Sequence, residues 1–191
     1  FEKMLYDQAM IIHAYLDAYL LTNDAYYINV INEVCEYVLR DMVAKEGGFY
    51  SAEDADSQGE EGVFYIWKTL EIKEILSTEE YEYIYDILEF NDKGNCKVEG
   101  HYTNIPHFKL SWEEIAEKYD LTKKEAIENY HRLRNQIFNF REERVHPQKD
   151  DKILTDWNGL MISAIARASY VFNNDLYRDS AIKAMEFITT F

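Results

Sequence analysis

The chain has 191 residues, of which 47% are hydrophobic, and a formal net charge of −16. This charge disfavours binding to nucleic acid or to an anionic membrane, because both need clustered lysine and arginine. The apolar content suffices for a sizeable core and predicts one domain over residues 1–191. Phe1 in place of a starting Met, and a helical pattern that still continues at Phe191, lead us to expect a piece of a longer protein.

The two cysteines, Cys35 and Cys96, have no zinc-type spacing and give no disulfide framework. Free thiols and a cytoplasmic location are therefore predicted. No apolar run approaches the roughly 18 residues that a membrane span needs. The sequence contains no metal-binding histidine pattern and no phosphate loop, so we expect neither a metal nor a cofactor.

Apolar periodicity predicts two helices at the start of the chain. From Met4 to Leu21 the residues are apolar on nearly all sides of a helix, which predicts burial on most sides. From Asp24 to Val43 the apolar residues follow a single stripe that includes Ile31 and Cys35. An inner helix followed by an outer helix is the expected arrangement.

The segment from Gly47 to Trp67 is the most distinctive part of the chain. It combines two adjacent glycines, a short aromatic strand, the acids Glu53, Asp54 and Asp56, and a returning apolar strand. This order predicts a small β-hairpin lying over helices.

Three interpretations of these acids stay open. Asp54 to Gly59 copies the start of a calcium-binding loop, but position twelve is Tyr65 where a bidentate Glu is required. The acids can instead cap a turn through backbone amides. In the third interpretation Glu53, Asp54 and Asp56 are catalytic, since cleavage at a glycosidic centre uses one carboxyl as acid and a second as base or nucleophile.

The middle of the chain carries three helix starts of the capping-box type. These are Ser77 with Glu80, Ser111 with Glu114, and Thr122 with Glu125. The last of them begins a long helix from Lys123 to about Glu143. The segment from Asn91 to Lys109 predicts a loop with one strand pair, and His107 in this loop is a candidate binding residue.

The end of the chain repeats its beginning. Trp157 to Phe172 is again mostly apolar, and Leu176 to Phe191 is more polar. At an offset of 151, Asn23-Asp24 aligns with Asn174-Asp175. One helical hairpin therefore occurs twice, and such hairpins bury their faces by stacking on neighbours.

The repeat also pairs Tyr6-Asp7 with Trp157-Asn158 at the first turns of the two inner helices. An aromatic face beside a hydrogen-bonding group suits a sugar ring, which makes these four residues candidates for substrate binding. Packing between helices is the alternative role for Tyr6 and Trp157. His13, between apolar neighbours, is expected to be a core histidine.

Four ordered motifs carry a family resemblance over nearly the whole chain. They are F-E-K-M-L-Y-D-Q-A from Phe1, G-G-F-Y-S-A-E-D-A-D-S from Gly47, E-G-V-F-Y-I-W from Glu61, and D-D-K-I-L-T-D-W-N-G-L-M-I from Asp150. With these motifs the chain resembles the thioredoxin-domain-containing proteins of the spermatogenesis-associated type. Asp156 departs from the pattern, since relatives usually carry a small residue there.

The resemblance implies a fold and an organisation. The expected fold is all-α, an incomplete α/α toroid of the six-hairpin glycosidase type, with inner and outer helices and a small β-hairpin. A thioredoxin-like domain of the same parent chain would precede it, further hairpins would follow, and part of a toroid on its own would expose core residues.

Two functions of different classes follow. In the first, the toroid acts on or binds a carbohydrate through the hairpin acids and the aromatic residues around a central cavity, as a glycoside hydrolase or sugar epimerase would. In the second, it is a non-catalytic binding or scaffold module that serves the thioredoxin-like domain. We expect the fragment alone to be inactive.

Overall fold

The computed structural model describes residues 1–190, which form two compact units. The terminal unit contains residues 2–55 and 148–190, and the central unit contains residue 1 and residues 56–147. Each unit has its own hydrophobic core. The all-α class with small β-hairpins is confirmed, whereas a single domain over the whole chain stays a prediction.

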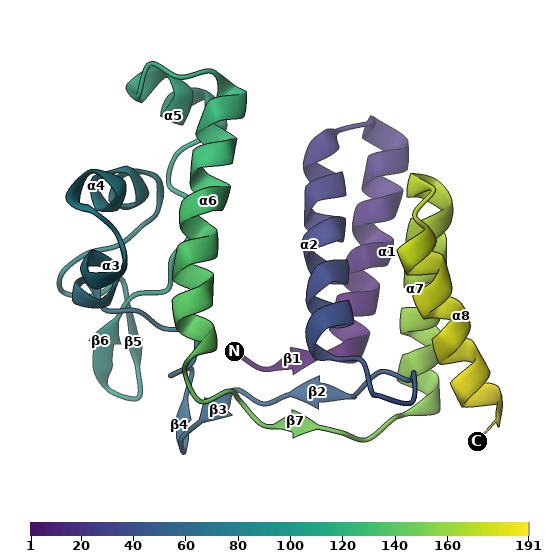
Figure 1. Ribbon diagram of the computed structural model, residues 1–191. Helices are drawn as coiled ribbons and strands as arrows, with labels where there is room; N and C mark the ends of the chain where they lie inside the picture. The colour runs from purple at the N-terminus through teal and green to yellow at the C-terminus, as the bar shows by residue number, and fades with distance from the viewer. Residues whose placement is uncertain (191) are drawn as a thin grey trace. The chain divides into compact units, whose positions relative to one another are not determined.

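Two helical hairpins build the terminal unit (Figure 1). Their helices are α1 (Leu5–Thr22), α2 (Ala25–Asp41), α7 (Thr155–Phe172) and α8 (Asp175–Thr190). The first two pack on each other, as do the last two, and α1 packs on α7, so α1 and α7 are the inner pair. The core between them is formed by Ala9, Ile12, Leu16, Met161, Ala164, Ile165 and Ala168.

Burial of α1 is more limited than its apolar sequence predicts. Within the terminal unit this helix packs against α2 and α7, and several of its apolar side chains are exposed. Met10 is 55% exposed and Leu21 is 86% exposed. The predicted burial on most sides is therefore wrong for α1 in this chain, because periodicity reports which residues are apolar and not how many neighbours a helix has.

The two hairpins match at an offset of 150, one residue less than the sequence alignment indicated. Helices α1 and α7 end at Asn23 and Asn173, whose φ angles of 55° and 50° are left-handed. Asp24 and Asn174 follow, and each side chain accepts a hydrogen bond from an amide in the first turn of the next helix. The repeat is confirmed as a structural unit, with corrected register.

A three-stranded antiparallel sheet lies in the terminal unit (Figure 1). Its central strand is β2 (Ala52–Glu53), which pairs with β1 (Lys3–Met4) on one side and β7 (Lys149–Asp150) on the other. The first part of the predicted hairpin therefore pairs with strands that are distant in sequence. Local patterning cannot select such partners, because they are fixed by contacts made after folding.

The hairpin observed in the acidic segment is shorter than the predicted one and belongs to the central unit. Strands β3 (Asp56–Ser57) and β4 (Glu60–Glu61) pair across Gln58 and Gly59, both with positive φ. The predicted return strand up to Trp67 is wrong, because residues 62–65 form a turn and Trp67 makes an isolated bridge with Asn104.

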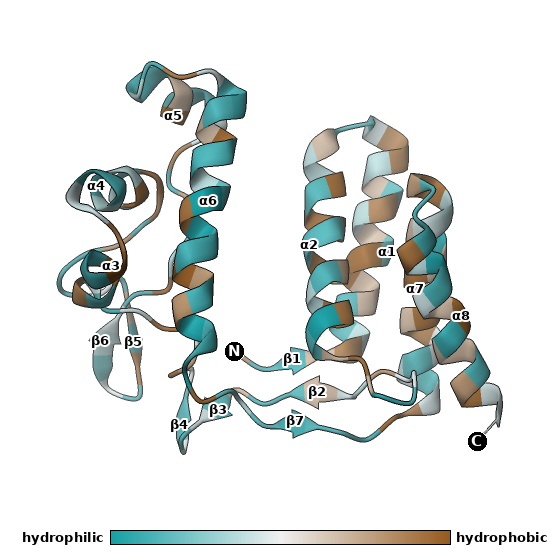
Figure 2. Ribbon diagram, viewed as in Figure 1, coloured by the Kyte–Doolittle hydropathy of each residue, from teal (hydrophilic) through white to brown (hydrophobic). Residues whose placement is uncertain are grey.

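Four further helices and a second hairpin complete the central unit. Helices are α3 (Thr69–Ile75), α4 (Thr78–Ile87), α5 (Trp112–Lys118) and α6 (Lys123–Glu142); the strands are β5 (Cys96–Val98) and β6 (His101–Thr103). Long helix α6 packs on α3, α4 and α5. Figure 2 shows it as a largely hydrophilic helix with apolar residues at intervals. The strand pair predicted in the loop is confirmed as β5–β6.

All three predicted capping boxes are confirmed. At the starts of α4, α5 and α6 the hydroxyl of the N-cap residue accepts from the amide three residues on, and the glutamate there accepts from the N-cap amide. These bonds satisfy amides that have no partner inside the helix. The interaction spans only three residues, which is why sequence spacing alone locates it.

The turn after β4 is held by Arg144, which follows α6. Its guanidinium donates hydrogen bonds to three backbone carbonyls and to the Glu71 carboxylate, and it lies 4.1 Å from the Trp67 ring centroid. The carbonyls belong to Val63, Phe64 and Ile66. One side chain thus connects the turn, the start of α3 and the end of α6.

We expect Gly62→Ala to destabilise the protein more than Gly59→Ala. Both glycines have left-handed φ angles, of 74° and 84°, which costs alanine about 1–2 kcal/mol. At Gly62 an added Cβ would also lie 2.5 Å from the Phe1 ring, whereas nothing lies within 4 Å at Gly59. Urea unfolding of both variants tests this. Equal losses would show that the Phe1 contact contributes nothing.

Candidate functional site

The inner helices begin side by side in the terminal unit without a side-chain cap. Apolar Met4 and Leu154 occupy the N-cap positions, and neither makes a capping hydrogen bond. The first turns instead carry the exposed acids Asp7 and Asp156. Because the start of a helix has a partial positive charge, these carboxylates are favourable there.

The aromatic residues predicted at these helix starts are in contact. The ring centroids of Tyr6 and Trp157 are 4.8 Å apart and the rings meet edge to face at 74°. Both residues are partly exposed. This geometry is a favourable aromatic pair, and Asp7 and Asp156 adjoin its two residues in sequence within the same first turns.

Asn158, predicted as a ligand contact, is fully buried and serves the fold. Its amide oxygen accepts from the backbone amide of Phe49 at 2.8 Å, and its amide nitrogen donates to the carbonyls of Phe49 and Leu154 at 2.9 and 3.0 Å. The side chain therefore fastens the segment before β2 to the start of α7. Its hydrogen-bonding groups are turned away from solvent.

Glu53 lies in the central strand β2 and is only 3% exposed. Its cross-strand partners are Lys3 on β1 and Lys149 on β7. Residues directly opposite each other in a sheet share a face, so Glu53 lies between two lysines on one face of the sheet.

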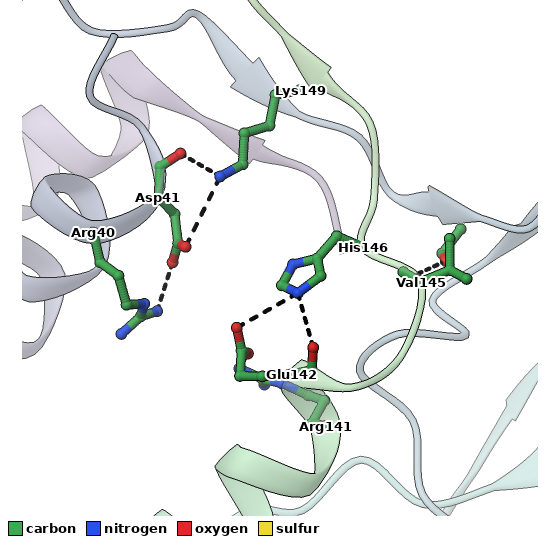
Figure 3. A network of polar contacts seen from close by, with 8 residues as sticks. Arg40, Asp41, Arg141, Glu142, Val145, His146 and Lys149 are labelled. Carbon is green, nitrogen blue, oxygen red and sulfur yellow. Dashed lines mark hydrogen bonds and ion pairs between the residues drawn. The ribbon is translucent and has the colours of Figure 1, made fainter. Parts of the chain in front are cut away.

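Lys149 also connects the sheet to the end of α2. Its ammonium donates to the backbone carbonyl of Asp41 and lies 3.9 Å from the Asp41 carboxylate, which pairs with Arg40 (Figure 3). Helix α2 ends at Asp41, where backbone carbonyls lack helical partners. The lysine therefore satisfies one of these carbonyls.

The other predicted catalytic acids are exposed. Asp54 follows β2, and its backbone amide donates to the carbonyl of Gln148. Asp56 begins β3 in the central unit. The acids that adjoin in sequence therefore belong to different units, and their catalytic roles stay predictions.

His107 also belongs to the central unit, where it is exposed and its Nδ1 lies 3.1 Å from the Ile105 carbonyl. Its binding role stays a prediction. Among residues 1–190, no group of three His, Cys, Asp or Glu side chains is arranged to hold a metal ion. None of the helices in the same described range is long and apolar enough to cross a membrane.

A polar link between the inner helices was missed from the sequence. Arg167 of α7 lies with Nη1 2.9 Å from Nδ1 of His13 and with Nη2 2.6 Å from the carboxylate of Asp17, both on α1. Arginine only donates hydrogen bonds, so the His13 nitrogen in this bond is unprotonated. The i, i+4 spacing of His13 and Asp17 was a usable signal, but their partner Arg167 lies 154 and 150 residues away, respectively.

Acidification is expected to weaken the terminal unit through His13. Burial, reinforced by the positive charge of Arg167, lowers the pKa of His13 from its usual 6.5 despite the opposing charge of Asp17. A group whose pKa is lower in the folded state favours folding at pH above its unfolded pKa, and this contribution is lost as the pH falls below about 6.5.

Urea unfolding between about pH 7 and pH 5 measures this effect. We expect His13→Asn, which retains an acceptor for Arg167 but does not titrate, to reduce the loss of stability on acidification. The matched control is His101→Asn, because His101 is exposed on β6. If both variants keep the slope of the wild type, the contribution of His13 is absent.

Comparison with known proteins gives relatives over the whole length of the chain. The chain is 31% identical over 212 residues to an uncharacterised protein of Caenorhabditis elegans, and the match covers 100% of this chain and 29% of that protein. It is 32% identical over 209 residues to spermatogenesis-associated protein 20 of Homo sapiens, covering 98% and 27%, respectively. The Mus musculus protein of the same name is 31% identical over 191 residues.

No protein-family model matches the chain. The chain spans less than a third of the length of these curated relatives. Their similarity supports a relationship between this chain and the spermatogenesis-associated protein 20 family.

Proposed function

We propose that the starts of α1 and α7 form part of a carbohydrate site in a six-hairpin glycosidase-like toroid of a longer protein. The observation that supports this most is the contact of Tyr6 with Trp157 beside the exposed acids Asp7 and Asp156. Sugar rings have apolar faces that pack on aromatic rings and hydroxyl groups that bond to carboxylates. The site offers both in adjacent helical turns.

The residues have separate roles in this proposal. Tyr6 and Trp157 contact the ring of the sugar, and Asp7 and Asp156 accept from its hydroxyls. Asp54 supplies the acid/base chemistry at the glycosidic bond, because among the three predicted catalytic acids it is the one that is both exposed and in the terminal unit. Asn158 is omitted because it is buried.

The rest of the parent protein supplies what this chain lacks. We propose that it contains a thioredoxin-like domain and the remaining hairpins of the toroid, that it is cytoplasmic, and that it hydrolyses or epimerises a sugar. The resemblance in motifs supports this organisation, and the two stacked helical hairpins of the terminal unit are compatible with it.

A panel of mono- and oligosaccharides tests the proposal, using thermal shift of the full-length protein. We expect at least one sugar to stabilise the wild type and Trp157→Ala to weaken its binding by roughly tenfold, as loss of an aromatic contact typically does. Trp157→Phe should retain most of the binding, and Trp112→Ala in the central unit is the matched control.

Asp54→Asn separates binding from catalysis, because it should retain the thermal shift but lose turnover of the bound sugar. If no sugar stabilises the full-length protein, the carbohydrate proposal is overturned. That outcome would favour the alternative, a non-catalytic scaffold module accompanying the thioredoxin-like domain.

A further inference from the structure

The central unit contains an open hollow of about 410 Å³ between the start of α3 and the β5–β6 hairpin. Its volume lies within the range of roughly 300–1,000 Å³ that small-molecule sites occupy. Apolar lining comes from Trp67, Leu70 and Tyr102, and charged lining from Lys68, Lys73 and Asp92. The hollow is independent of the carbohydrate proposal, whose binding residues belong to the terminal unit.

Asn104 makes one wall of this hollow rigid. It is 2% exposed, and its side-chain oxygen accepts from the backbone amides of Asn91 and Asn95 at 2.9 and 3.2 Å. Its side-chain nitrogen donates to the carbonyls of Asn91 and Trp67. The loop from Asn91 to Asn95 is thus fastened to the strand bridge between Trp67 and Asn104.

The same loop lies directly on β6 at Gly94. A Cβ at this position would lie 2.4 Å from the backbone nitrogen of Thr103, so only glycine permits the approach. Thr103 in turn donates from its hydroxyl to the Trp67 carbonyl. The backbone around the hollow is therefore fixed before any ligand arrives, which lowers the cost of ordering on binding.

The charged groups at the hollow are exposed and come from two segments. Lys68 and Lys73 belong to the α3 segment, and Asp92 to the loop. Among residues 1–190 none of the three forms an ion pair, although the Lys73 ammonium lies 4.9 Å from the Tyr81 ring centroid. Two positive charges and one negative charge around an apolar floor complement a molecule that carries both signs.

We propose that this hollow binds a small zwitterion of the α-amino acid type with an apolar side chain. The carboxylate pairs with Lys68 and Lys73, and the ammonium pairs with Asp92. The apolar side chain of the ligand packs on the exposed side chains of Leu70 and Tyr102. Neither a plain anion nor a plain cation satisfies both kinds of charge.

Three ligands that share a phenyl group test the charge pattern on the full chain. They are phenylalanine, phenylacetate, which lacks the ammonium, and phenethylamine, which lacks the carboxylate. Binding is followed by the backbone amide NMR signals of Tyr102, Thr103 and Asn104. We expect saturable shifts with phenylalanine and roughly two- to fivefold weaker binding of the other two, the usual effect of losing an exposed charge pair.

Variants show which charged group of the ligand each charged side chain binds. Lys68→Gln and Lys73→Gln should each weaken phenylalanine binding and leave phenethylamine unchanged, and Asp92→Asn should weaken phenylalanine and leave phenylacetate unchanged. Lys93→Gln is the matched control, because Lys93 adjoins Asp92 in the loop but does not line the hollow. Equal binding of phenylalanine and phenylacetate, or no saturable shift at roughly 10 mM phenylalanine, would overturn the proposal.

Discussion

Replacing Arg144 with methionine is expected to lower the free energy of unfolding of the central unit by about 3–4 kcal/mol. Its guanidinium donates to three carbonyls of the turn after β4 and to Glu71, and the side chain is only 15% exposed. Methionine fills similar space but donates nothing. Three carbonyls and a carboxylate would then lose a charged donor at once.

Native-state hydrogen exchange locates this effect. Exchange should accelerate at the amides of Tyr65 and Ile66, which donate to the Gly62 carbonyl within the turn. Arg144→Lys should recover only part of the lost stability, since an ammonium keeps the positive charge but cannot reproduce the planar fork of the guanidinium. The control is Arg132→Met, which removes an exposed pair with Glu80 and should cost at most about 1 kcal/mol. Equal losses in both methionine variants would contradict the assigned role of Arg144.

Asn158→Ala is expected to lower the free energy of unfolding of the terminal unit by about 2–4 kcal/mol. The substitution removes hydrogen bonds to the amide and the carbonyl of Phe49 and to the carbonyl of Leu154. These backbone groups would be left buried without that partner. Urea unfolding measures the loss, and hydrogen exchange at Phe49 localises it.

Asn158→Asp distinguishes hydrogen bonding from packing. Aspartate has nearly the same shape and still accepts from Phe49, but it cannot donate to the two carbonyls and adds a buried charge. We expect it to be no more stable than Asn158→Ala. Asn29→Ala, at an exposed position of α2, is the control and should change the free energy by less than about 0.5 kcal/mol. If Asn158→Asp is as stable as the wild type, the donated bonds are unimportant.

Features that depend on neighbours in sequence could be predicted. The capping boxes that begin with Ser77, Ser111 and Thr122 were located because both partners lie three residues apart. The repeated helical hairpin was also recognised from its apolar pattern. Its register was off by one residue, because the match of Asn23 with Asn173 depends on the left-handed backbone at both positions.

Features that depend on distant partners could not be predicted. The strand containing Glu53 pairs with β1 and β7 instead of a local return strand. Asn158 is a residue type that often contacts ligands, but its amide group bonds to the backbone of Phe49, 109 residues away, and to the carbonyl of Leu154. Arg144 and Arg167 were not singled out, because an isolated arginine in sequence gives no indication of what it will contact.

The sequence by itself determined the helices other than α3, the three capping boxes, the repeated hairpin and the aromatic residues at the inner helix starts. These properties follow from periodicity and from hydrogen bonds spanning a few residues, which the order of residues encodes directly. Only the tertiary structure decided that Tyr6 meets Trp157, that Asn158 faces inward and that Glu53 lies between two lysines. Each of these joins segments more than 45 residues apart, and such contacts are selected by packing of the whole unit.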